Sequence, residues 1–310
     1  MTHRLPKRVR LDICTACQLK CKDCYMRKSN YGTVGKGYTT AEQFKEFLKR
    51  NPFIQEIEIS NSGEIFLNPD FEKILEIAYN NKIKLTANNG VNLNSIKETA
   101  IEKIVKFQLY SLNISLDGAS DEVYKTYRIN GKFNKVIANI ELINKYKEIY
   151  HSNYPLLNWQ YIVMDTTQDI NEIKRAKKLA KQLNMSISFK KTWNESFIPI
   201  NSDLLEKETK LSFSKETPFS FNWIPCLELW NSPQINWDGR LLGCCCVYLN
   251  DFKCNVFNVG LEKALKSKEV RYAKRLLTGK CMQDNTIDIP CNDCPYYLKM
   301  KKNKNFISST

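Results

Sequence analysis

The stretch Val9–Met26, VRLDICTACQLKCKDCYM, joins a β-strand pattern to a loop that is dense in cysteine. The pattern at Val9–Ile13 predicts a first strand. Directly after it, Cys17, Cys21 and Cys24 have the spacing C-x3-C-x2-C. Three thiolates from one loop suit three corners of an iron–sulfur cubane, for which cysteine is the usual ligand. The stretch therefore predicts a cluster with one open iron at the carboxyl end of the first strand.

Beyond this loop, β-rich runs alternate with helix patterns as far as Lys190. Further strands are predicted at Ile54–Ser60, Ile83–Ala87, Ser111–Leu116, Trp159–Met164 and Ser186–Lys190. Helices are predicted at Thr39–Arg50, Phe71–Asn80, Asn94–Lys106, Ser120–Tyr127, Phe133–Lys147 and Ile170–Leu183. This alternation predicts an α/β fold with a parallel sheet, either doubly wound or an incomplete barrel. In both, functional residues gather at the carboxyl ends of the strands.

A zinc site is the alternative for the first cysteines. With Cys14 included, the spacing becomes C-x2-C-x3-C-x2-C. Structural zinc normally takes two pairs of ligands with a longer insertion between them. Three intervening residues leave little room to wrap around one ion, so the spacing favours the cluster. Cys14 itself is expected to be a small buried residue near the first strand.

The three-cysteine motif followed by an aromatic residue, Tyr25, resembles the signature of the radical S-adenosylmethionine (radical SAM) superfamily. In that family the cysteines hold a [4Fe-4S] cluster whose open iron binds SAM. An electron from the cluster cleaves SAM to a 5′-deoxyadenosyl radical, which abstracts a hydrogen atom from the substrate. The resemblance implies that Cys17, Cys21 and Cys24 are the cluster ligands. It also implies a partial (β/α)6 TIM-like barrel over about Leu11–Lys190.

Four more segments are similar to SAM-binding segments of the family. Ser62-Gly63-Glu64 is similar to its Gly-Gly-Glu, although Ser62 stands where the family often has glycine. Asn88-Asn89-Gly90, after the third strand, is similar to a Thr-Asn-Gly, and Ser115-Leu116-Asp117-Gly118 to a Ser-Leu-Asp-Gly near the SAM ribose. In Tyr127–Gly131, Arg128 is expected to face the SAM carboxylate. The resemblance implies that SAM is surrounded by Gly63, Glu64, Asn89, Ser115, Asp117 and Arg128.

Eight of the twelve cysteines lie beyond residue 220. Asp238-Gly239 predicts a tight hairpin that brings Cys244 back beside the segment holding Cys226. A helix is expected at Leu261–Leu277, followed by a Cys-Asn-Asp-Cys knuckle that ends at Cys294. Four cysteines in two pairs could enclose one metal ion or one cluster, and this set alone does not exclude zinc.

The pattern C-x12-G-x4-C that begins at Cys226 is similar to the opening of the SPASM domain, which carries auxiliary iron–sulfur clusters in radical SAM enzymes. No cysteine follows Cys294, so the resemblance is to the shortened twitch domain with one auxiliary [4Fe-4S] cluster. The spacing is similar to that of the radical SAM dehydrogenase of aminoglycoside synthesis. The implied ligands are Cys226, Cys244, Cys291 and Cys294. Cys254 or Cys281 could replace one of them, and a second auxiliary cluster lacks the usual spacing.

Cys245 directly follows one of these implied ligands. Sulfatase-maturing relatives carry an aspartate base at a similar position, which this chain lacks. A thiol at Cys245 could instead donate a hydrogen atom to a substrate radical, which makes it the candidate catalytic residue. The alternative is that Cys245 and Cys246 pack beside the cluster.

The predicted organisation is a radical SAM barrel over residues 1–215, a twitch domain over 216–300 and a basic tail over 301–310. The chain has 310 residues and a net charge of +14. That charge suits an acidic small-molecule substrate or an acidic flavodoxin or ferredoxin reductant, but equally a lysine-rich surface without a binding role. No apolar run is long enough for a signal peptide or a membrane span, so a reducing cytoplasm is expected. No pattern of a nucleic-acid-binding module is present.

The expected function is that of a radical SAM oxidoreductase or epimerase acting on a small polar metabolite such as a sugar or cyclitol. The auxiliary cluster would accept an electron from the substrate or position it. The main alternative is a peptide- or protein-modifying enzyme of the epimerase, crosslinking or maturase type. The motif begins at Cys17, which leaves no room for a preceding leader-binding domain and favours the small substrate. A non-enzymatic zinc or nucleic-acid-binding protein is the third possibility.

Overall fold

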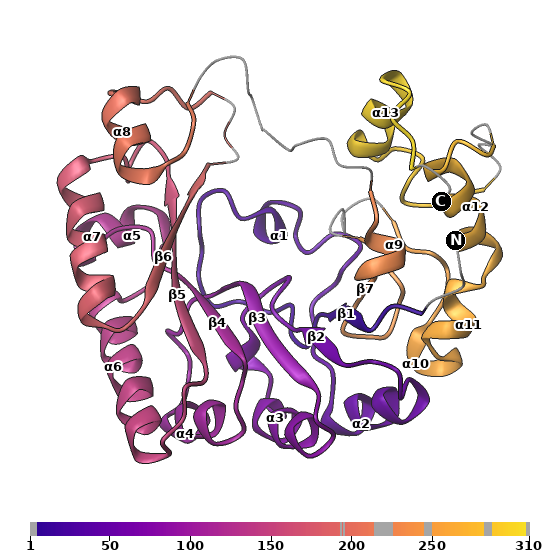
Figure 1. Ribbon diagram of the computed structural model, residues 1–310, viewed down its shortest axis with the longest axis horizontal. Helices are drawn as coiled ribbons and strands as arrows, with labels where there is room; N and C mark the ends of the chain where they lie inside the picture. Colours follow the sequence, from indigo (N-terminus) through magenta and orange to yellow (C-terminus); the bar gives the residue numbers. More distant parts are fainter. Residues whose placement is uncertain are drawn as a thin grey trace. The chain divides into compact units, whose positions relative to one another are not determined.

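The computed structural model describes residues 5–192, 194, 196–213, 226–244, 250–281 and 287–307. Its strands form a seven-stranded sheet in the order β6-β5-β4-β3-β2-β1-β7 (Figure 1). The described pairings between these strands are parallel. The predicted α/β class is therefore confirmed, as an open parallel sheet with the alternation of a partial TIM-like barrel. No helix in the described ranges is long and apolar enough to cross a membrane.

The predicted elements up to residue 191 are present, with their ends moved by a few residues. The strands are β1 (Arg8–Leu11), β2 (Glu56–Glu58), β3 (Lys84–Val91), β4 (Ser111–Ser115), β5 (Leu156–Val163) and β6 (Ser186–Lys191). The alternating helices are α2 (Ala41–Arg50), α3 (Phe71–Asn80), α4 (Glu98–Lys106), α5 (Asp121–Tyr127), α6 (Phe133–Ile149) and α7 (Ile170–Gln182). Among the described residues up to 213, three short elements were not predicted: α1 (Tyr25–Lys28), the 3-10 helix η1 (Ile65–Leu67) and α8 (Ser202–Thr209).

Side chains at the helix starts explain several of these boundaries. Thr40 and Gln43 form a capping box at the start of α2, each side chain accepting a hydrogen bond from the backbone N–H of the other. Ser120 accepts from the Val123 N–H to begin α5. Asp169 accepts from the N–H groups of Asn171 and Glu172 to begin α7. Each cap satisfies a donor that the first helical turn would otherwise leave unpaired.

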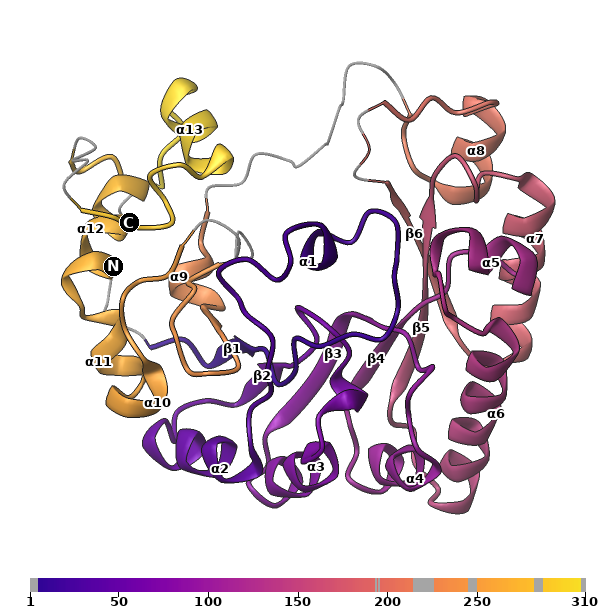
Figure 2. The same ribbon diagram turned by 180° about the vertical axis from the view of Figure 1, so that it is seen from behind.

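The chain forms two compact units. The first unit comprises residues 1–16, 29–85 and 221–310, and the second unit comprises residues 17–28 and 86–220. The first unit thus contains β1 and β2 together with the C-terminal segment, whereas the second contains the cysteine loop and strands β4 to β6 (Figure 2). The predicted domain border at residues 215 and 216 falls outside the described residues and stays a prediction.

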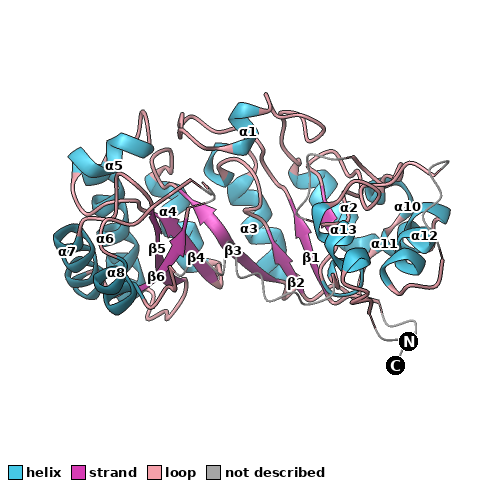
Figure 3. Cartoon of the chain, turned by 90° about the horizontal axis from the view of Figure 1, so that it is seen from above, coloured by secondary structure: helices cyan, strands magenta, loops and turns pink. Residues whose placement is uncertain are grey.

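In the second unit, alternate residues of the strands face the helices. Leu157, Trp159 and Tyr161 of β5 are buried. The ring of Trp159 contacts that of Phe133, the first residue of α6, with 6.3 Å between the ring centroids. α6 and α7 lie along the same side of β5 and β6 (Figure 3). Because side chains alternate along a strand, Asn158 and Gln160 point to the opposite face.

In the first unit, the predicted hairpin at Asp238-Gly239 is present. It begins at an unpredicted strand, β7 (Gln234–Ile235), which pairs with β1 and extends the sheet. Ile235 forms an antiparallel bridge with Leu241 across the turn. Gly239 has φ +88°, and a Cβ there would lie 2.6 Å from the Asn255 Oδ1, so glycine is required.

The C-terminal helices differ from the single helix predicted at Leu261–Leu277. That segment forms two helices, because Ser267 interrupts the first and caps the second by accepting from the Val270 N–H at 3.3 Å. The described helices here are α9 (Glu228–Asn231), α10 (Val256–Val259), α11 (Leu261–Leu265), α12 (Lys268–Leu277) and α13 (Pro295–Lys302). α13 extends into the predicted basic tail, so the first residues of that tail are helical.

Candidate functional site

The loop of the second unit places three thiols close together along the chain. Its backbone is fixed by the Lys20 N–H, which donates to the Ile129 carbonyl at 3.0 Å, and by Arg27 Nη1, which donates to the Lys20 carbonyl at 2.8 Å. Cys21 is buried, whereas Cys17 and Cys24 are half-buried. The sequence predicts no metal ligand on this loop besides these three cysteines. Three soft thiolates on one loop fit a [4Fe-4S] cluster that keeps one iron open.

Two side chains from distant parts of the second unit donate to these sulfurs. Asn92 Nδ2 lies 3.8 Å from Cys17 Sγ, and Arg128 Nη1 lies 3.6 Å from Cys21 Sγ. Gln18 Nε2 donates to Asn92 Oδ1 at 2.8 Å and so holds the asparagine in place. Asn92 was not predicted as a site residue. The asparagine-rich run at the end of β3 was the only sequence signal for it.

Asp117 and Arg128 form a buried ion pair in the second unit. Arg128 Nε donates to Asp117 Oδ2 at 2.6 Å, and the Ile162 N–H donates to Asp117 Oδ1 at 2.8 Å. Burial disfavours the arginine cation, but the carboxylate of Asp117 outweighs it and raises the pKa of Arg128. Burial also raises the pKa of the Cys21 thiol, and the nearby Arg128 opposes that rise. Arg128 is thus a fixed cation beside a predicted cluster ligand.

Two other predicted SAM contacts belong to the second unit. The predicted position of Asn88-Asn89-Gly90 after the third strand is wrong, because β3 continues to Val91, with a shift of register against β4 between Ala87 and Val91. Gly90 has φ +119°, and a Cβ there would lie 2.5 Å from Ser115 Oγ. Glycine therefore lets β3 approach Ser115 closely. The second unit holds Asn89, Ser115, Asp117 and Arg128 together with the three cysteines.

The face of the sheet opposite α6 and α7 carries a ladder of amide and hydroxyl side chains. Asn113 Nδ2 donates to Gln160 Oε1 at 3.0 Å, and Asn158 Nδ2 donates to Asn113 Oδ1 at 2.6 Å. The ladder continues to the edge strand, because Asn158 Nδ2 also donates to Ser188 Oγ at 2.8 Å. Lys190 is next on this face after Ser188, and burial lowers its pKa. The amide ladder, defined as Asn113, Asn158, Gln160 and Ser188, is uncharged.

Gly63 and Glu64 lie in the first unit, beside the end of the segment formed by residues 1–16. Gly63 has φ +68°, and a Cβ there would lie 2.6 Å from the carbonyl oxygen of Thr15. The Glu64 N–H donates to the Ala16 carbonyl at 2.8 Å, and the Glu64 side chain is fully buried. Glycine is therefore needed for this turn to contact the backbone just before the cysteine loop. The SAM role predicted for both residues stays a prediction.

One pocket of the first unit is lined by the four predicted auxiliary ligands, Cys226, Cys244, Cys291 and Cys294. The rest of its lining is mostly apolar and includes Leu229, Phe252, Leu277, Pro290 and Tyr297. Burial, together with the neighbouring Cys244, raises the pKa of Cys226 to about 12. Burial and the same neighbour also raise that of Cys291. Four mutually close thiols in an apolar cavity fit a cluster with complete protein ligation.

The assignment of a cluster and not a zinc ion to this pocket stays a prediction from the cysteine spacing. Zinc draws its thiolates to about 2.3 Å, so four ligands of one ion stand close together. Among the described residues, no group of three or more His, Cys, Asp or Glu side chains is arranged to hold a metal ion.

The remaining cysteines have other surroundings. Cys14 is buried as predicted, and its thiol lies 3.9 Å from the Ala16 carbonyl. Burial raises the pKa of Cys14 to about 11. Cys254 and Cys281 are half-buried and do not line the pocket of the four cysteines. Cys245 and Cys246 lie outside the described residues, so the hydrogen-donor role of Cys245 stays a prediction.

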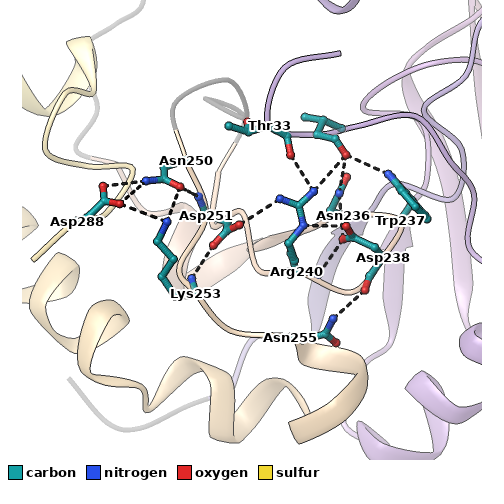
Figure 4. A network of polar contacts seen from close by, with 11 residues as sticks. Thr33, Asn236, Trp237, Asp238, Arg240, Asn250, Asp251, Lys253, Asn255 and Asp288 are labelled. Carbon is teal, nitrogen blue, oxygen red and sulfur yellow. Dashed lines mark hydrogen bonds and ion pairs between the residues drawn. The ribbon is translucent and has the colours of Figure 1, made fainter. Parts of the chain in front are cut away.

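A polar network around Arg240 fixes the hairpin that carries Cys244 (Figure 4). Arg240 Nε donates to Asp238 Oδ2 at 2.7 Å, and its Nη1 donates to Asp251 Oδ2 at 3.1 Å. Its Nη2 donates to the Thr33 carbonyl at 2.8 Å. The sequence singled out only Asp238 of these residues, as part of the predicted hairpin, since Thr33 lies more than 200 positions from Arg240. The network holds the hairpin against two other segments of the first unit.

Comparisons with known proteins concern the family and the fold of the chain. A sequence model of one family, described as "Radical SAM superfamily", matches residues 11–186. No curated protein matches the chain in sequence. The structure of Streptococcus suis SuiB bound to S-adenosylmethionine is similar with a TM-score of 0.65 at 15% identity, covering 94% of this chain and 71% of that chain.

Two further solved structures have the same fold. SuiB crystallised alone gives a TM-score of 0.64 at 16% identity, covering 85% of this chain and 66% of that chain. This chain thus spans about two thirds of that SuiB chain. BtrN in complex with AdoMet and 2-DOIA gives a TM-score of 0.50 at 12% identity, covering 88% of this chain and 87% of that chain. At these identities the likeness concerns the fold alone.

Proposed function

Because the chain belongs to the radical SAM superfamily, we propose that it oxidises a small polar metabolite, such as a sugar or cyclitol, after abstracting a hydrogen atom from it. The family implies SAM and a [4Fe-4S] cluster, which together supply the radical chemistry. We assign Cys17, Cys21 and Cys24 as the ligands of that cluster. The three residues lie on one loop, and two of them accept N–H groups from side chains of the same unit.

The proposed SAM contacts follow from the surroundings of each residue. Arg128 uses Nε and Nη1 for Asp117 and Cys21, and its Nη2 has no partner among the described residues. That nitrogen is therefore available for the SAM carboxylate, as guanidinium groups bind carboxylates well. Asp117 holds the guanidinium of Arg128 in place. Ser115, another proposed SAM contact, lies next to Gly90. Glu64 and Gly63 are proposed to bind the methionine amino group.

The pocket lined by four cysteines is the observation that carries the proposal of oxidation. A cluster held by Cys226, Cys244, Cys291 and Cys294 has no iron left for SAM and suits electron transfer instead. Loss of a hydrogen atom, one electron and one proton completes a two-electron oxidation of an alcohol to a carbonyl. The electron would go to the auxiliary cluster and the proton to solvent. An epimerase would instead require return of a hydrogen atom, for which Cys245 is the proposed donor.

The amide ladder supports a polar substrate that binds through hydrogen bonds. Asn113 and Gln160 are almost fully buried, whereas Asn158 and Ser188 are partly exposed on the same face. Amides and hydroxyls offer both donors and acceptors and match the hydroxyl groups of a sugar or cyclitol. They also match the backbone of a peptide, which keeps peptide modification as the second candidate.

Anaerobic reconstitution tests the proposal. We expect about eight irons per chain, reductive cleavage of SAM, and transfer of deuterium from a labelled substrate into 5′-deoxyadenosine. Cys291→Ala should lose about four of those irons and the oxidised product, yet still cleave SAM. Cys254→Ala is the matched control, since Cys254 does not line the pocket, and it should behave as the unsubstituted enzyme.

Two outcomes would contradict the proposal. If Cys291→Ala keeps all its iron, the auxiliary ligands are wrong. If the unsubstituted protein takes up zinc and cleaves no SAM under reducing conditions, the enzymatic function itself is wrong. Deuterium transfer from a peptide, with none from sugars or cyclitols, would favour the second candidate. The proposal also places the enzyme in a reducing compartment such as the cytoplasm, with a flavodoxin or ferredoxin as reductant.

A further inference from the structure

We infer that Asn92 and Arg128 are positioning residues that raise the reduction potential of the SAM-binding cluster, each by donating an N–H group to a ligand sulfur. The inference rests on the proposed assignment of Cys17, Cys21 and Cys24 as ligands. It goes beyond that assignment, because it concerns how readily the cluster is reduced and not whether it binds.

The orientation of Asn92 is fixed by two donors on its oxygen. Gln18 Nε2 donates to Asn92 Oδ1 at 2.8 Å, and the Asn94 N–H donates to the same oxygen at 2.9 Å. With its oxygen occupied in this way, the amide directs Nδ2 toward Cys17 Sγ at 3.8 Å. The Asn92 residue is only 4% exposed. A buried amide with one defined orientation is a specific donor to the sulfur.

Arg128 reaches Cys21 by an equally constrained route. Its Nε is bonded to Asp117 Oδ2 at 2.6 Å, which fixes the plane of the guanidinium. Nη1 of the same plane then lies 3.6 Å from Cys21 Sγ. Asp117 is fully buried and also accepts the Ile162 N–H at 2.8 Å. Because Asp117 fixes the guanidinium, Arg128 brings both its positive charge and a directed N–H group to the sulfur.

Cys24, the third cysteine of the loop, differs from Cys17 and Cys21 in its hydrogen bonding. No side chain in the described ranges donates to Cys24 Sγ, although Cys24 lies on the same loop. Donation to Cys17 and Cys21 is therefore not a general property of the loop. It depends on residues that the sheet brings in from 75 and 107 positions away.

Physical chemistry gives the direction of the effect. Reduction adds negative charge to the cluster, and part of that charge falls on the ligand sulfurs. An N–H group that donates to such a sulfur stabilises the reduced form more than the oxidised form. Burial strengthens the interaction because water does not screen it. Both donors therefore make the cluster easier to reduce.

The primary test is potentiometric titration of the reconstituted holoenzyme, followed by electron paramagnetic resonance. The SAM-binding cluster is identified in the unsubstituted enzyme by the change of its spectrum when SAM is added. For Asn92→Ala we expect about a tenfold lower ratio of reduced to oxidised cluster at a fixed potential, which corresponds to about 59 mV. Asn139→Ala is the matched control, because Asn139 Nδ2 donates to the Leu93 carbonyl at 2.8 Å and to no cysteine. It should leave the ratio unchanged.

Arg128→Lys is the second arm, since lysine keeps the cation but not the planar arrangement of donors. We expect it to lower the reduced fraction at the same fixed potential. Lys22→Gln is its control, because it removes a cation from the exposed part of the loop without touching a sulfur. Replacing Arg128 in its ion pair with Asp117 can prevent folding. In that case the titration of Asn92→Ala alone tests the inference.

The inference is overturned if Asn92→Ala retains a SAM-responsive cluster whose reduced fraction equals that of the unsubstituted enzyme. It is also overturned if Arg128→Lys retains a SAM-responsive cluster whose reduced fraction equals that of the unsubstituted enzyme, because the planar arrangement of donors would then have no effect. The complete absence of a SAM-responsive signal in the unsubstituted holoenzyme would instead contradict the assignment of the three ligands. Failure of the inference and failure of the proposed function are therefore distinguishable.

Discussion

Single residues decide whether the segments near the cysteine loop can meet. Gly63 and Gly90 both have positive φ, and each stands where a Cβ would collide with a neighbouring segment. The sequence pointed to Gly63 only through its likeness to a family motif. The reason for glycine is the contact with Thr15, a residue 48 positions earlier, and such a contact is visible only in the folded chain.

Gly63→Ala tests this contact. A Cβ at 2.6 Å from the Thr15 carbonyl oxygen adds a collision to the cost of a positive φ, so we expect the free energy of unfolding to fall by about 1–3 kcal/mol. Thermal or denaturant unfolding measures the change. Gly32→Ala is the control, since Gly32 has φ +40° but no atom closer than 3.7 Å. Equal losses for both variants would show that the close approach is unimportant.

The donors to the cysteines could not be predicted at the residue scale. Cys17, Cys21 and Cys24 stand out because their spacing is local and suits few kinds of site besides a cluster. Gln18 has no local pattern that marks it, and the asparagine-rich run at the end of β3 does not single out Asn92, since asparagine is common in turns. Their role depends on a long-range contact, and a single sequence carries no direct signal for such contacts.

At the scale of elements, the regular part of the sheet was predictable. β-branched and apolar runs alternate with amphipathic helices, and caps such as Thr40 with Gln43 mark where helices begin. β7 was missed because two residues are too few to show a period. The split between α11 and α12 was missed because the apolar period continues across Ser267, whose cap becomes evident only in the folded chain.

The unpredicted pairing of β7 with β1 creates a buried carboxyl group. Leu11 is opposite Ile235 in this pair, and Gln234 Nε2 donates to Asp12 Oδ2 at 2.8 Å. Burial raises the pKa of Asp12 to about 7, the neighbouring Glu58 adds to the rise, and Gln234 and Ser62 partly offset it. The folded protein therefore holds a proton on Asp12 at pH values where the unfolded chain, with a pKa of about 3.9, has lost it.

This difference predicts a dependence of stability on pH. The stabilisation from protonated Asp12 is complete below about pH 4 and is lost as the pH rises to about 7, with an upper limit of about 4 kcal/mol. Asp12→Asn should therefore flatten the decrease in unfolding free energy between about pH 4 and 7, measured by denaturant titration. Asp70→Asn is the contrast, because the Ala41 N–H and Lys73 lower the pKa of Asp70. Asp70→Asn should change the slope only at lower pH, and an unaltered slope for Asp12→Asn would refute the raised pKa of Asp12.

At the scale of the whole molecule, the two proposed cluster sites belong to different units. The second unit holds the three-cysteine loop, and the first unit holds the pocket lined by four cysteines. A net charge of +14 belongs to the chain as a whole. Such a charge attracts an acidic electron donor over distances of several ångströms, and salt weakens that attraction.

The charge predicts how reduction by a protein partner responds to salt. With reduced flavodoxin as electron donor, SAM cleavage should slow several-fold when the ionic strength is raised from about 0.05 M to about 0.3 M. With titanium(III) citrate as reductant, the same rise should matter less, since a small chelate does not need to dock on the protein surface. Initial rates of 5′-deoxyadenosine formation measure both. Equal salt sensitivity would argue against electrostatic docking.

The amide ladder has a consequence for selectivity that concerns analogues of the substrate. In the proposed complex, a substrate hydroxyl bonds to a donor or acceptor that the ladder does not use internally, and a ligand without that hydroxyl leaves this one group unpaired, which is costly inside the protein. Sites built in this way reject a deoxy analogue far more strongly than they reject an analogue with one extra methylene, often by a factor of about 10⁴. Under the proposal that the amide ladder binds the substrate, we expect the enzyme to refuse a ligand that lacks a single hydroxyl more strongly than a ligand with one added methylene.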